Sequence, residues 1–434
     1  MDSAALITQM QQIGLWPQDT AAQQVIDTLR QKHAADVRAF ARELLQRDFL
    51  TAYQANLLLT GKGRQLVIGP YVILERLGEG GMGQVYKARH RQIQRLVALK
   101  VIRPDRVTSA NAVARFLREV RAASRMNDPN IVRAFDADAA DGTYYFAMEI
   151  VHGTDLSVYV RSRGPLPIEQ ACQLLWQAAN GLQHIHEQGM VHRDIKPGNL
   201  MLALEETPTT VGPAGIAVRT TPAVLKILDL GLARLKEDDK GGSSGSQLGI
   251  THEGTVIGTA DYIAPEQARD SRLADIRSDI YALGCAFYFA LTGQVPFPGG
   301  APVDKMLRHQ IDEPPPLDRF RPHVPMLLAT IIKRMMAKNP ADRYQTPAEV
   351  AAALGPLVAG DNGPPPLAIP VGQAEQQTLA DLATREDRRV VARPHKPADR
   401  YLSLWAVAFL SALAAVVFFS LAMVFAILMR ALMN

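Results

Sequence analysis

Cysteine is scarce in this chain of 434 residues. Only Cys172 and Cys285 occur, each inside an apolar stretch with helical spacing, and neither belongs to a CxxC pair or to a metal-ligand spacing. This scarcity excludes a disulfide framework and a cysteine-based zinc site. We interpret both residues as buried thiols in a reducing compartment.

The chain also lacks a strong charge of either sign. Lysine and arginine number 47 against 43 aspartate and glutamate residues, which gives a formal net charge of +4. No long basic run with interleaved aromatic residues is present, so the composition indicates no nucleic-acid partner. The first segment, MDSAALITQMQQ, lacks the basic start and the apolar core of a signal peptide. Nothing in it predicts export of the N-terminus.

One long stretch contains no charged residue at all. It covers residues 402–429 and exceeds the roughly 20 residues that cross a bilayer. Six basic residues precede it in residues 385–400, only Arg430 follows it, and basic flanks stay in the cytoplasm. We therefore expect a transmembrane helix over 402–429 in a single-pass protein of the inner (cytoplasmic) membrane, with residues 1–400 in the cytoplasm. A buried core helix is the alternative, but such helices seldom run this long without a charge.

Hydrophobic spacing divides the rest of the chain. Residues 1–65 have helical spacing and predict a small helical module of unknown role, and the breakers in TGKGRQLVIGP separate this module from the next segment. Apolar and polar residues then alternate in YVILERLG, QVYKARH and LVALKVI, which predicts antiparallel strands. Helical spacing dominates beyond about residue 155, and residues 358–400 have the composition of a juxtamembrane linker.

The expected fold class is therefore α+β. A small antiparallel-sheet lobe occupies about residues 71–150, and a larger helical lobe occupies about residues 151–357.

A glycine-rich segment lies within the predicted strands. In LGEGGMGQVYK the residues Gly78, Gly80 and Gly83 are spaced G-x-G-x-x-G, and Val85 follows. A dinucleotide-binding loop would open a helix, whereas QVYKARH continues as a strand, so we expect the loop to join the two strands of a hairpin. Glycine allows backbone N–H groups to approach phosphate oxygens.

The strand VALKVI places Lys100 in apolar surroundings, where an ammonium group needs an anion. Glu119, on the predicted helix FLREVRAASRM, can supply one. Together the two residues could hold the α- and β-phosphates of a nucleotide.

The stretch VHRDIKPGNL, residues 191–200, concentrates polar side chains between apolar segments. About thirty residues later, Asp229 ends a predicted strand, and with Asn199 it offers the oxygen ligands that Mg²⁺ prefers. Phosphoryl transfer needs a carboxylate that receives the hydroxyl proton and a cation near the γ-phosphate. Asp194 and Lys196 can supply these groups.

In this order the motifs resemble the protein kinase family, and specifically its bacterial eukaryotic-like Ser/Thr kinases. The resemblance covers about residues 71–357 and includes the glycine-rich loop, VALK, HRDIKPGN, DLG in place of D-F-G, and APE in GTADYIAPEQA. It implies the bilobal kinase fold, ATP and Mg²⁺ as cofactors, and Ser/Thr hydroxyls of proteins as substrates. A homodimer that autophosphorylates in trans is a further expectation.

The resemblance also implies roles for individual residues. Asp279 would brace the catalytic loop, Arg343 would pair with Glu266, and Thr259 would contact Asp194 and Lys196. The residues expected to bind ATP are Leu77, Gly78, Glu79, Gly80, Gly81, Met82, Gly83, Gln84, Val85, Ala98, Lys100, Glu119, Met148 as gatekeeper, Glu149 and Val151.

Residues 236–259 resemble an activation loop, in which a phosphate would pair with Arg193. We expect Thr251 to be the main autophosphorylation site, with Glu253 in the place of a second phosphate and Thr255 as a further candidate. Residues 203–222 form an insertion of unknown purpose that is longer than the family usually has.

Three other interpretations compete with an active protein kinase. A pseudokinase scaffold would be favoured by the loss of Lys100, Asp194 or Asp229, and all three are present. Alternatively, residues 1–65 are the functional part and the kinase regulates them. A phosphotransferase acting on small molecules shares the lobe pattern, but GTADYIAPEQA resembles a platform for protein substrates.

Overall fold

The structure is a computed structural model of the whole chain. It describes residues 2–80, 83–103, 120, 124, 126–203, 210–211, 217–221, 224–229, 260–358 and 367–370. The chain divides into two compact units, one of Met1–Thr210 with Arg219–Ile369 and the other of Val211–Val218 with Pro370–Asn434. The candidate active site lies in the first unit.

Four helices open the chain: α1 (Ser3–Ile13), α2 (Thr20–Lys32), α3 (Val37–Gln46) and α4 (Ala52–Leu59), followed by the 3₁₀ turn η1 (Gly63–Leu66). Each begins at a residue whose side-chain oxygen accepts a hydrogen bond from a backbone N–H of the first turn, which is the preferred chemistry of an N-cap; these residues are Asp2, Asp19, Asp36 and Thr51. Their apolar faces form a common core that includes Leu6, Met10, Ile26, Phe40 and Leu58.

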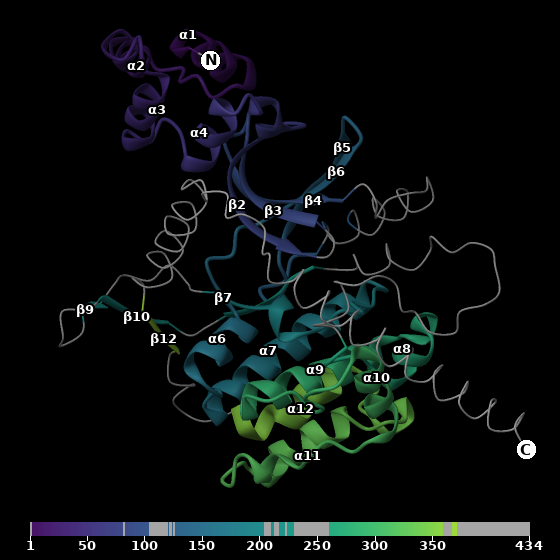
Figure 1. The fold of residues 1–434 in the computed structure, drawn as a ribbon. Helices are drawn as coiled ribbons and strands as arrows, with labels where there is room; N and C mark the ends of the chain where they lie inside the picture. The colour runs from purple at the N-terminus through teal and green to yellow at the C-terminus, as the bar shows by residue number, and fades with distance from the viewer. Residues whose placement is uncertain are drawn as a thin grey trace, which may run out of the picture. The chain divides into compact units, whose positions relative to one another are not determined.

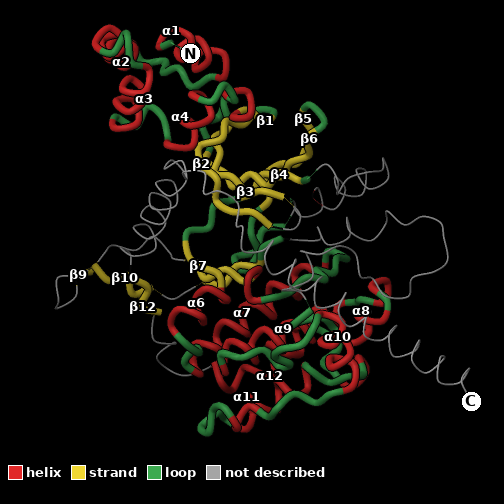
Figure 2. Tube along the Cα trace, viewed as in Figure 1, coloured by secondary structure: helices red, strands yellow, loops and turns green. Residues whose placement is uncertain are grey.

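A six-stranded sheet comes next, with every neighbouring pair antiparallel and the order β1-β2-β3-β4-β6-β5. Its strands are β1 (Val67–Ile68), β2 (Tyr71–Gly80), β3 (Gly83–His90), β4 (Leu96–Ile102), β5 (Ala134–Ala140) and β6 (Thr143–Met148), shown in yellow in Figure 2. The alternation of apolar and polar residues predicted β2, β3 and β4 correctly. The glycine-rich segment joins β2 to β3 as a hairpin, as predicted.

The helical lobe is built around one helix that is buried on all sides. In α9 nearly every residue from Ile276 to Leu291 is buried, as expected for a helix that is apolar all round. Figure 1 shows α9 among α7, α10, α11 and α12. The elements of this lobe are β7 (Gly153–Asp155), α6 (Leu156–Arg163), α7 (Ile168–Glu187), η3 (Pro197–Asn199), β8 (Leu200–Ala203), β11 (Val224–Ile227), α8 (Pro265–Arg269), η5 (Ser271–Leu273), α9 (Ile276–Thr292), α10 (Pro302–Ile311), η6 (Leu317–Arg319), α11 (Met326–Met335), η7 (Pro340–Asp342) and α12 (Pro347–Val358). Short strands also occur at β9 (Thr210–Val211), β10 (Ala217–Thr221) and β12 (Leu367–Pro370).

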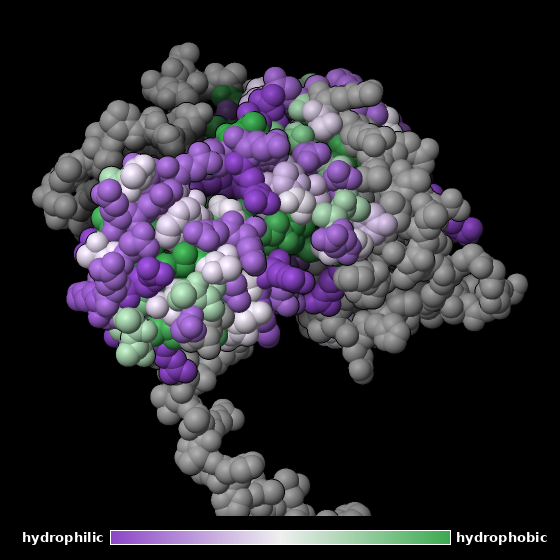
Figure 3. Space-filling view, turned by 90° about the horizontal axis from the view of Figure 1, so that it is seen from above, coloured by the Kyte–Doolittle hydropathy of each residue, from purple (hydrophilic) through white to green (hydrophobic). Residues whose placement is uncertain are grey.

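Most of the surface in Figure 3 is hydrophilic among the described residues, with small hydrophobic areas between. Apolar side chains are correspondingly collected in the cores. Both cysteines are buried and unpaired, as predicted, and burial raises the pKa of Cys172 to about 11 and of Cys285 to about 12.

Among the described residues, every helix is too short or too polar to cross a bilayer. The predicted span at 402–429 lies outside the described residues.

Candidate active site

The segment between α7 and β8 carries Asp194 and two polar side chains that contact it. The Lys196 ammonium lies 2.7 Å from Oδ2 of Asp194. The Asn199 amide Nδ2 donates to the backbone oxygen of Asp194 at 2.8 Å and faces its Oδ2 at 3.3 Å. The turn η3 makes this possible, because Pro197 begins it and Asn199 is its last residue, so the amide folds back over Asp194. The carboxylate, the ammonium and the amide predicted from the sequence are thus held in one cluster.

A buried carboxylate on α9, that of Asp279, binds the backbone of the same segment. Oδ2 of Asp279 accepts the backbone N–H of His192 at 2.8 Å, and Oδ1 accepts that of Arg193 at 2.7 Å. Arg193 has φ 65°, a left-handed conformation that is uncommon for a residue with a side chain. Burial raises the pKa of Asp279 above its usual value. The two N–H bonds and the nearby His192 and Arg193 lower the pKa, but by less than burial raises it. The predicted brace of the catalytic loop is therefore present.

Lys100 and Asp229 form a buried ion pair between the sheet and the helical lobe. The Lys100 Nζ on β4 lies 2.7 Å from Oδ1 of Asp229, and the lysine side chain is only 6% exposed. Burial by itself raises the pKa of Asp229, but the Lys100 ammonium, together with His192 and Lys196, outweighs it, so the pKa lies below its usual value. Asp229 also has a left-handed φ of 62°, a strained conformation of the kind that collects at functional sites. The pair holds Asp229 as a carboxylate.

Hydrogen bonds connect Asp229 to the Asp194 cluster through its neighbour Leu228. The Leu228 N–H donates to the backbone oxygen of Asn199 at 2.9 Å. The Leu228 oxygen lies 2.7 Å from Nε2 of His192. Because Leu228 directly precedes Asp229, these bonds hold the backbone next to Asp229 against the loop that carries Asp194.

The glycine-rich hairpin lies at one end of the sheet. Gly78 pairs with Val85 and Gly80 with Gly83. A Cβ atom on Gly83 would lie 1.9 Å from the Val101 carbonyl oxygen, so only glycine fits at this position. Val85 packs against the main core, whereas Leu77 is 49% exposed.

The segment after β6 occupies the position of the predicted hinge. Ala98 and Met148 are both buried and face each other in register between β4 and β6. The Glu149 carboxylate accepts the Arg133 N–H at 2.9 Å and pairs with Lys226 at 2.8 Å. The Glu149 N–H in turn donates to the Arg133 oxygen at 2.9 Å, so the group through which Glu149 can serve a nucleotide is its backbone carbonyl.

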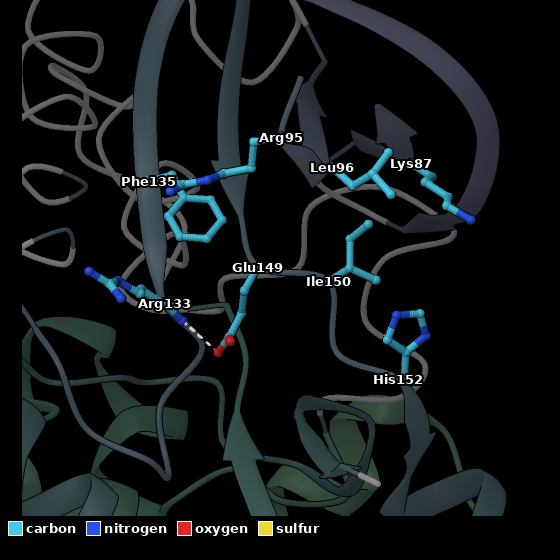
Figure 4. A pocket seen from close by; sticks show the side chains of 8 residues that line it. All are labelled: Lys87, Arg95, Leu96, Arg133, Phe135, Glu149, Ile150 and His152. Carbon is cyan, nitrogen blue, oxygen red and sulfur yellow. Dashed lines mark hydrogen bonds between the residues drawn. The ribbon is translucent and has the colours of Figure 1, made fainter. Parts of the chain in front are cut away.

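A hollow of about 450 Å³ lies beside this hinge, as Figure 4 shows. Its lining contains none of Lys100, Asp194 and Asp229, so it is not the reacting centre. It is lined by Lys87, Arg95, Leu96, Arg133, Phe135, Glu149, Ile150 and His152.

Six predicted site residues lie outside the described residues. They are Gly81, Met82, Glu119, Thr251, Thr255 and Thr259. Lys100, for which the sequence suggested Glu119, has Asp229 as its described partner. No local pattern in the sequence indicates this pairing, because the two residues are 129 positions apart and lie in different motifs.

Another predicted pair is present in full. Arg343 is completely buried, and its two terminal nitrogens donate to the two Glu266 oxygens at 2.8 and 2.9 Å. Ser278 also donates to Glu266, at 2.6 Å. Burial by itself raises the pKa of Glu266, but the bonds from Arg343 lower it below its usual value. This pair fastens the first turn of α8 to Arg343, the C-cap residue of η7.

The donor groups fit a nucleotide with a divalent metal. Asn199 uses its Nδ2 on Asp194, which leaves the amide oxygen as its ligand atom, and Asp229 is held as an anion. An amide oxygen and a carboxylate are hard ligands that suit Mg²⁺. The buried ammonium of Lys100 suits a phosphate oxygen.

Comparisons with known proteins agree with this arrangement. The family model described as "Protein kinase domain" matches residues 71–353. The chain is 37% identical over 294 residues to the serine/threonine-protein kinase pkn3 of Myxococcus xanthus, and 36% identical over 318 residues to PknB of Mycobacterium tuberculosis. The first match covers 67% of this chain and 50% of that protein, and the second covers 72% and 46%. The chain thus spans about half the length of these relatives.

The fold is similar to that in solved structures as well. The crystal structure of the Mycobacterium tuberculosis PknI kinase domain matches with a TM-score of 0.50 at 25% identity. That match covers 67% of this chain and 97% of the PknI chain.

Proposed function

Because this chain belongs to the protein kinase family, we propose that it transfers the γ-phosphoryl group of ATP to serine and threonine hydroxyls of proteins. The observation that carries the proposal is the convergence of Asp194, Lys196 and Asn199 with the Lys100–Asp229 pair. Each group has a role in phosphoryl transfer, and hydrogen bonds and ion pairs hold all of them in one site.

Each side chain has a separate task in this reaction. Asp194 accepts the proton of the attacking hydroxyl, and Lys196, 2.7 Å from it, balances the charge that develops on the transferred group. Asn199 and Asp229 would hold the metal ion, which supplies charge neutralisation on the phosphates. Lys100 would orient the phosphates from the sheet side. Little covalent chemistry is asked of the protein, so the rate depends on positioning.

Intact-mass spectrometry of the full chain with ATP and Mg²⁺ tests this function. We expect added phosphate on the parent and none on Asp194→Asn, which keeps the size of the side chain but cannot accept the proton. Glu169→Gln, an exposed carboxylate on α7, serves as the matched control and is expected to behave as the parent. A parent that binds ATP but adds no phosphate to itself or to generic protein substrates would contradict the proposal.

We further propose that the chain is regulated by autophosphorylation in trans within a homodimer. Thr251 is the favoured acceptor and Thr255 the second, with Arg193 as the partner of the phosphate. Active enzyme mixed with the Asp194→Asn variant should phosphorylate the variant at Thr251, which peptide mapping detects. Phosphate found only on the active copies would contradict the transfer in trans, and an unmodified Thr251 would contradict the site.

We also propose that residues 402–429 anchor the chain in the cytoplasmic membrane. The absence of charge over this stretch and the basic residues before it support the proposal. Fractionation of cells that express the full chain should place it with the membranes even after an alkaline wash. Recovery in the wash would contradict an integral span.

A further inference from the structure

The N-terminal helices are joined to the glycine-rich hairpin by hydrogen bonds at an irregularity of β2. The register between β2 and β3 shifts twice, between Ile73 and Glu75 and again between Arg76 and Gly78, and at the first shift Leu74 has no opposite residue on β3. The Gln54 amide Nε2 donates to the Ile73 oxygen at 2.8 Å, and the Thr51 hydroxyl donates to the Leu74 oxygen. Two side chains of the N-terminal helices thus bind consecutive carbonyl groups at a β-bulge.

Both side chains are held in place by the start of α4. The Thr51 hydroxyl accepts the Gln54 N–H at 3.2 Å, and the Gln54 Oε1 accepts the Thr51 N–H at 3.0 Å. This is a capping box, in which each side chain satisfies the other residue's backbone N–H group. Gln54 is 2% exposed, and both atoms of its amide are bonded: Oε1 accepts the Thr51 N–H, and Nε2 donates to the Ile73 oxygen. The same two residues therefore cap the start of α4 and bind β2. Figure 1 shows α4 beside β2.

A hydrophobic contact extends the attachment to β3. Ile73 and Tyr86 belong to the core of the N-terminal helices, and the rings of Tyr53 and Tyr86 lie 6.0 Å apart. The next residue toward the glycines, Val85, packs against the other core, which contains Ala98 and Met148. Successive residues of a strand point to opposite faces. Holding Tyr86 on the helical face therefore holds Val85 on the side of the nucleotide site.

A third contact reaches the turn after β3. The space beside Gly14, the left-handed C-cap residue of α1, is occupied by the Arg91 guanidinium, whose Nε would lie 3.0 Å from a Cβ there. A cation at a helix C-terminus is favourable. The N-terminal helices therefore contact the sheet at two places: α4 contacts β2, and the end of α1 contacts the turn after β3.

We propose that Thr51 and Gln54 are positioning residues for nucleotide binding. They fix the first bulge of β2 and, with it, the position from which β2 runs on to the glycine-rich hairpin. Leu74 lies four residues before Gly78, roughly 13 Å along an extended strand. A slip of β2 by one residue against β3 would move the β2 side chains to the opposite face and would turn Leu77, a predicted nucleotide contact, away from the nucleotide. The inference rests on the proposed function, because the ligand of the hairpin is the ATP of that reaction.

The test compares Thr51→Val and Gln54→Met with the parent in the full chain. Both changes keep the shape of the side chain and remove its donor. We expect the KM for ATP and the Kd for magnesium ADP, measured by calorimetry, to rise about fivefold, the size of one net hydrogen bond. The kcat at saturating ATP should change less than about twofold, because the groups around Asp194 are untouched. Thr51→Ser, which keeps the hydroxyl, should have the KM for ATP and the Kd for magnesium ADP of the parent.

Asp36→Ala is the matched control. It removes the N-cap of α3, whose bonds to Arg38 and Ala39 stay inside the N-terminal helices. It should lower the melting temperature without changing the Kd for magnesium ADP. An equal rise in Kd for Asp36→Ala would overturn the inference, since general loosening of the helices would then explain the effect.

Unchanged constants in folded Thr51→Val would also overturn it. Because Thr51 is only half-buried, this variant keeps the test decisive even where Gln54→Met does not fold. A parent that binds ADP but transfers no phosphate would refute the proposed function alone, and the Kd comparison would still decide the role of Thr51 and Gln54.

Discussion

Asp279 on α9 accepts the backbone N–H of Arg193 at 2.7 Å and thereby holds a left-handed residue next to Asp194, the proposed proton acceptor. The carboxylate is 1% exposed, and water cannot replace it as an acceptor. The position of Asp194 thus depends on a side chain 85 residues away in the sequence.

We expect Asp279→Asn to lower kcat at least tenfold and to reduce stability by about 1–3 kcal/mol, because an amide can accept only one of the two N–H groups well. Thermal melting and steady-state kinetics measure the two effects. The control is Asp275→Asn, which changes the N-cap of the same helix and leaves the Arg193 contact intact. Wild-type kcat in a folded Asp279→Asn would contradict the role assigned to the brace.

Asp229→Asn should raise the Mg²⁺ concentration needed for half-maximal activity by about tenfold or more, because one of two ligand groups loses its charge. Activity measured against free Mg²⁺ gives this value, and a chelator should abolish activity in the parent. Glu169→Gln provides the reference for a carboxylate removed elsewhere. An unchanged Mg²⁺ dependence would exclude Asp229 as a ligand.

Replacing Arg343 by lysine should destabilise the protein by about 3 kcal/mol, since the change breaks a buried pair and lysine cannot form two parallel bonds to Glu266. The folded-state pKa of Glu266 is lowered. Ionised Glu266 therefore contributes its full stabilisation of the folded state above the ordinary glutamate pKa of 4.5. This stabilisation is lost as the pH falls through the lower pKa of the folded state. Urea unfolding of parent and variant between pH 7 and pH 3 measures both effects. Equal stabilities at pH 7 would contradict the prediction.

His309 should make the protein less stable below neutral pH. It is fully buried on α10, and its Nδ1 lies 2.8 Å from the Tyr281 hydroxyl. Burial lowers its pKa to about 3 from the ordinary 6.5. Between these values the unfolded chain binds a proton that the folded protein does not, so stability falls as the pH is lowered, by up to about 1.4 kcal/mol per pH unit.

Urea unfolding at pH 7, 6 and 5 measures that slope. His309→Gln cannot titrate and should show a smaller slope, whereas the exposed His323→Gln should keep the slope of the parent. Parallel slopes for the parent and His309→Gln would contradict the assignment.

Local patterns were sufficient for much of the fold. Alternation predicted β2, β3 and β4, and helical spacing predicted α7, because these patterns depend on which face of an element is buried and need no knowledge of distant residues. The resemblance predicted the Glu266–Arg343 pair and the brace at Asp279, since motifs specify residue types at positions that packing requires. The catalytic candidates Asp194, Lys196 and Asn199 were identified in the same way.

Other relationships are visible only in three dimensions. The left-handed backbone at Arg193 and Asp229, the pairing of Lys100 with Asp229, and the bonds from Thr51 and Gln54 to β2 join residues that share no local pattern. The sequence by itself determined β2, β3, β4 and α7, the buried cysteines and the candidates for the reacting groups, because these depend on residue type and short-range spacing. Only the tertiary structure brought Asp229 to Lys100 and the side chains of Thr51 and Gln54 to β2, because those contacts form only when separate elements pack and bury their polar groups together.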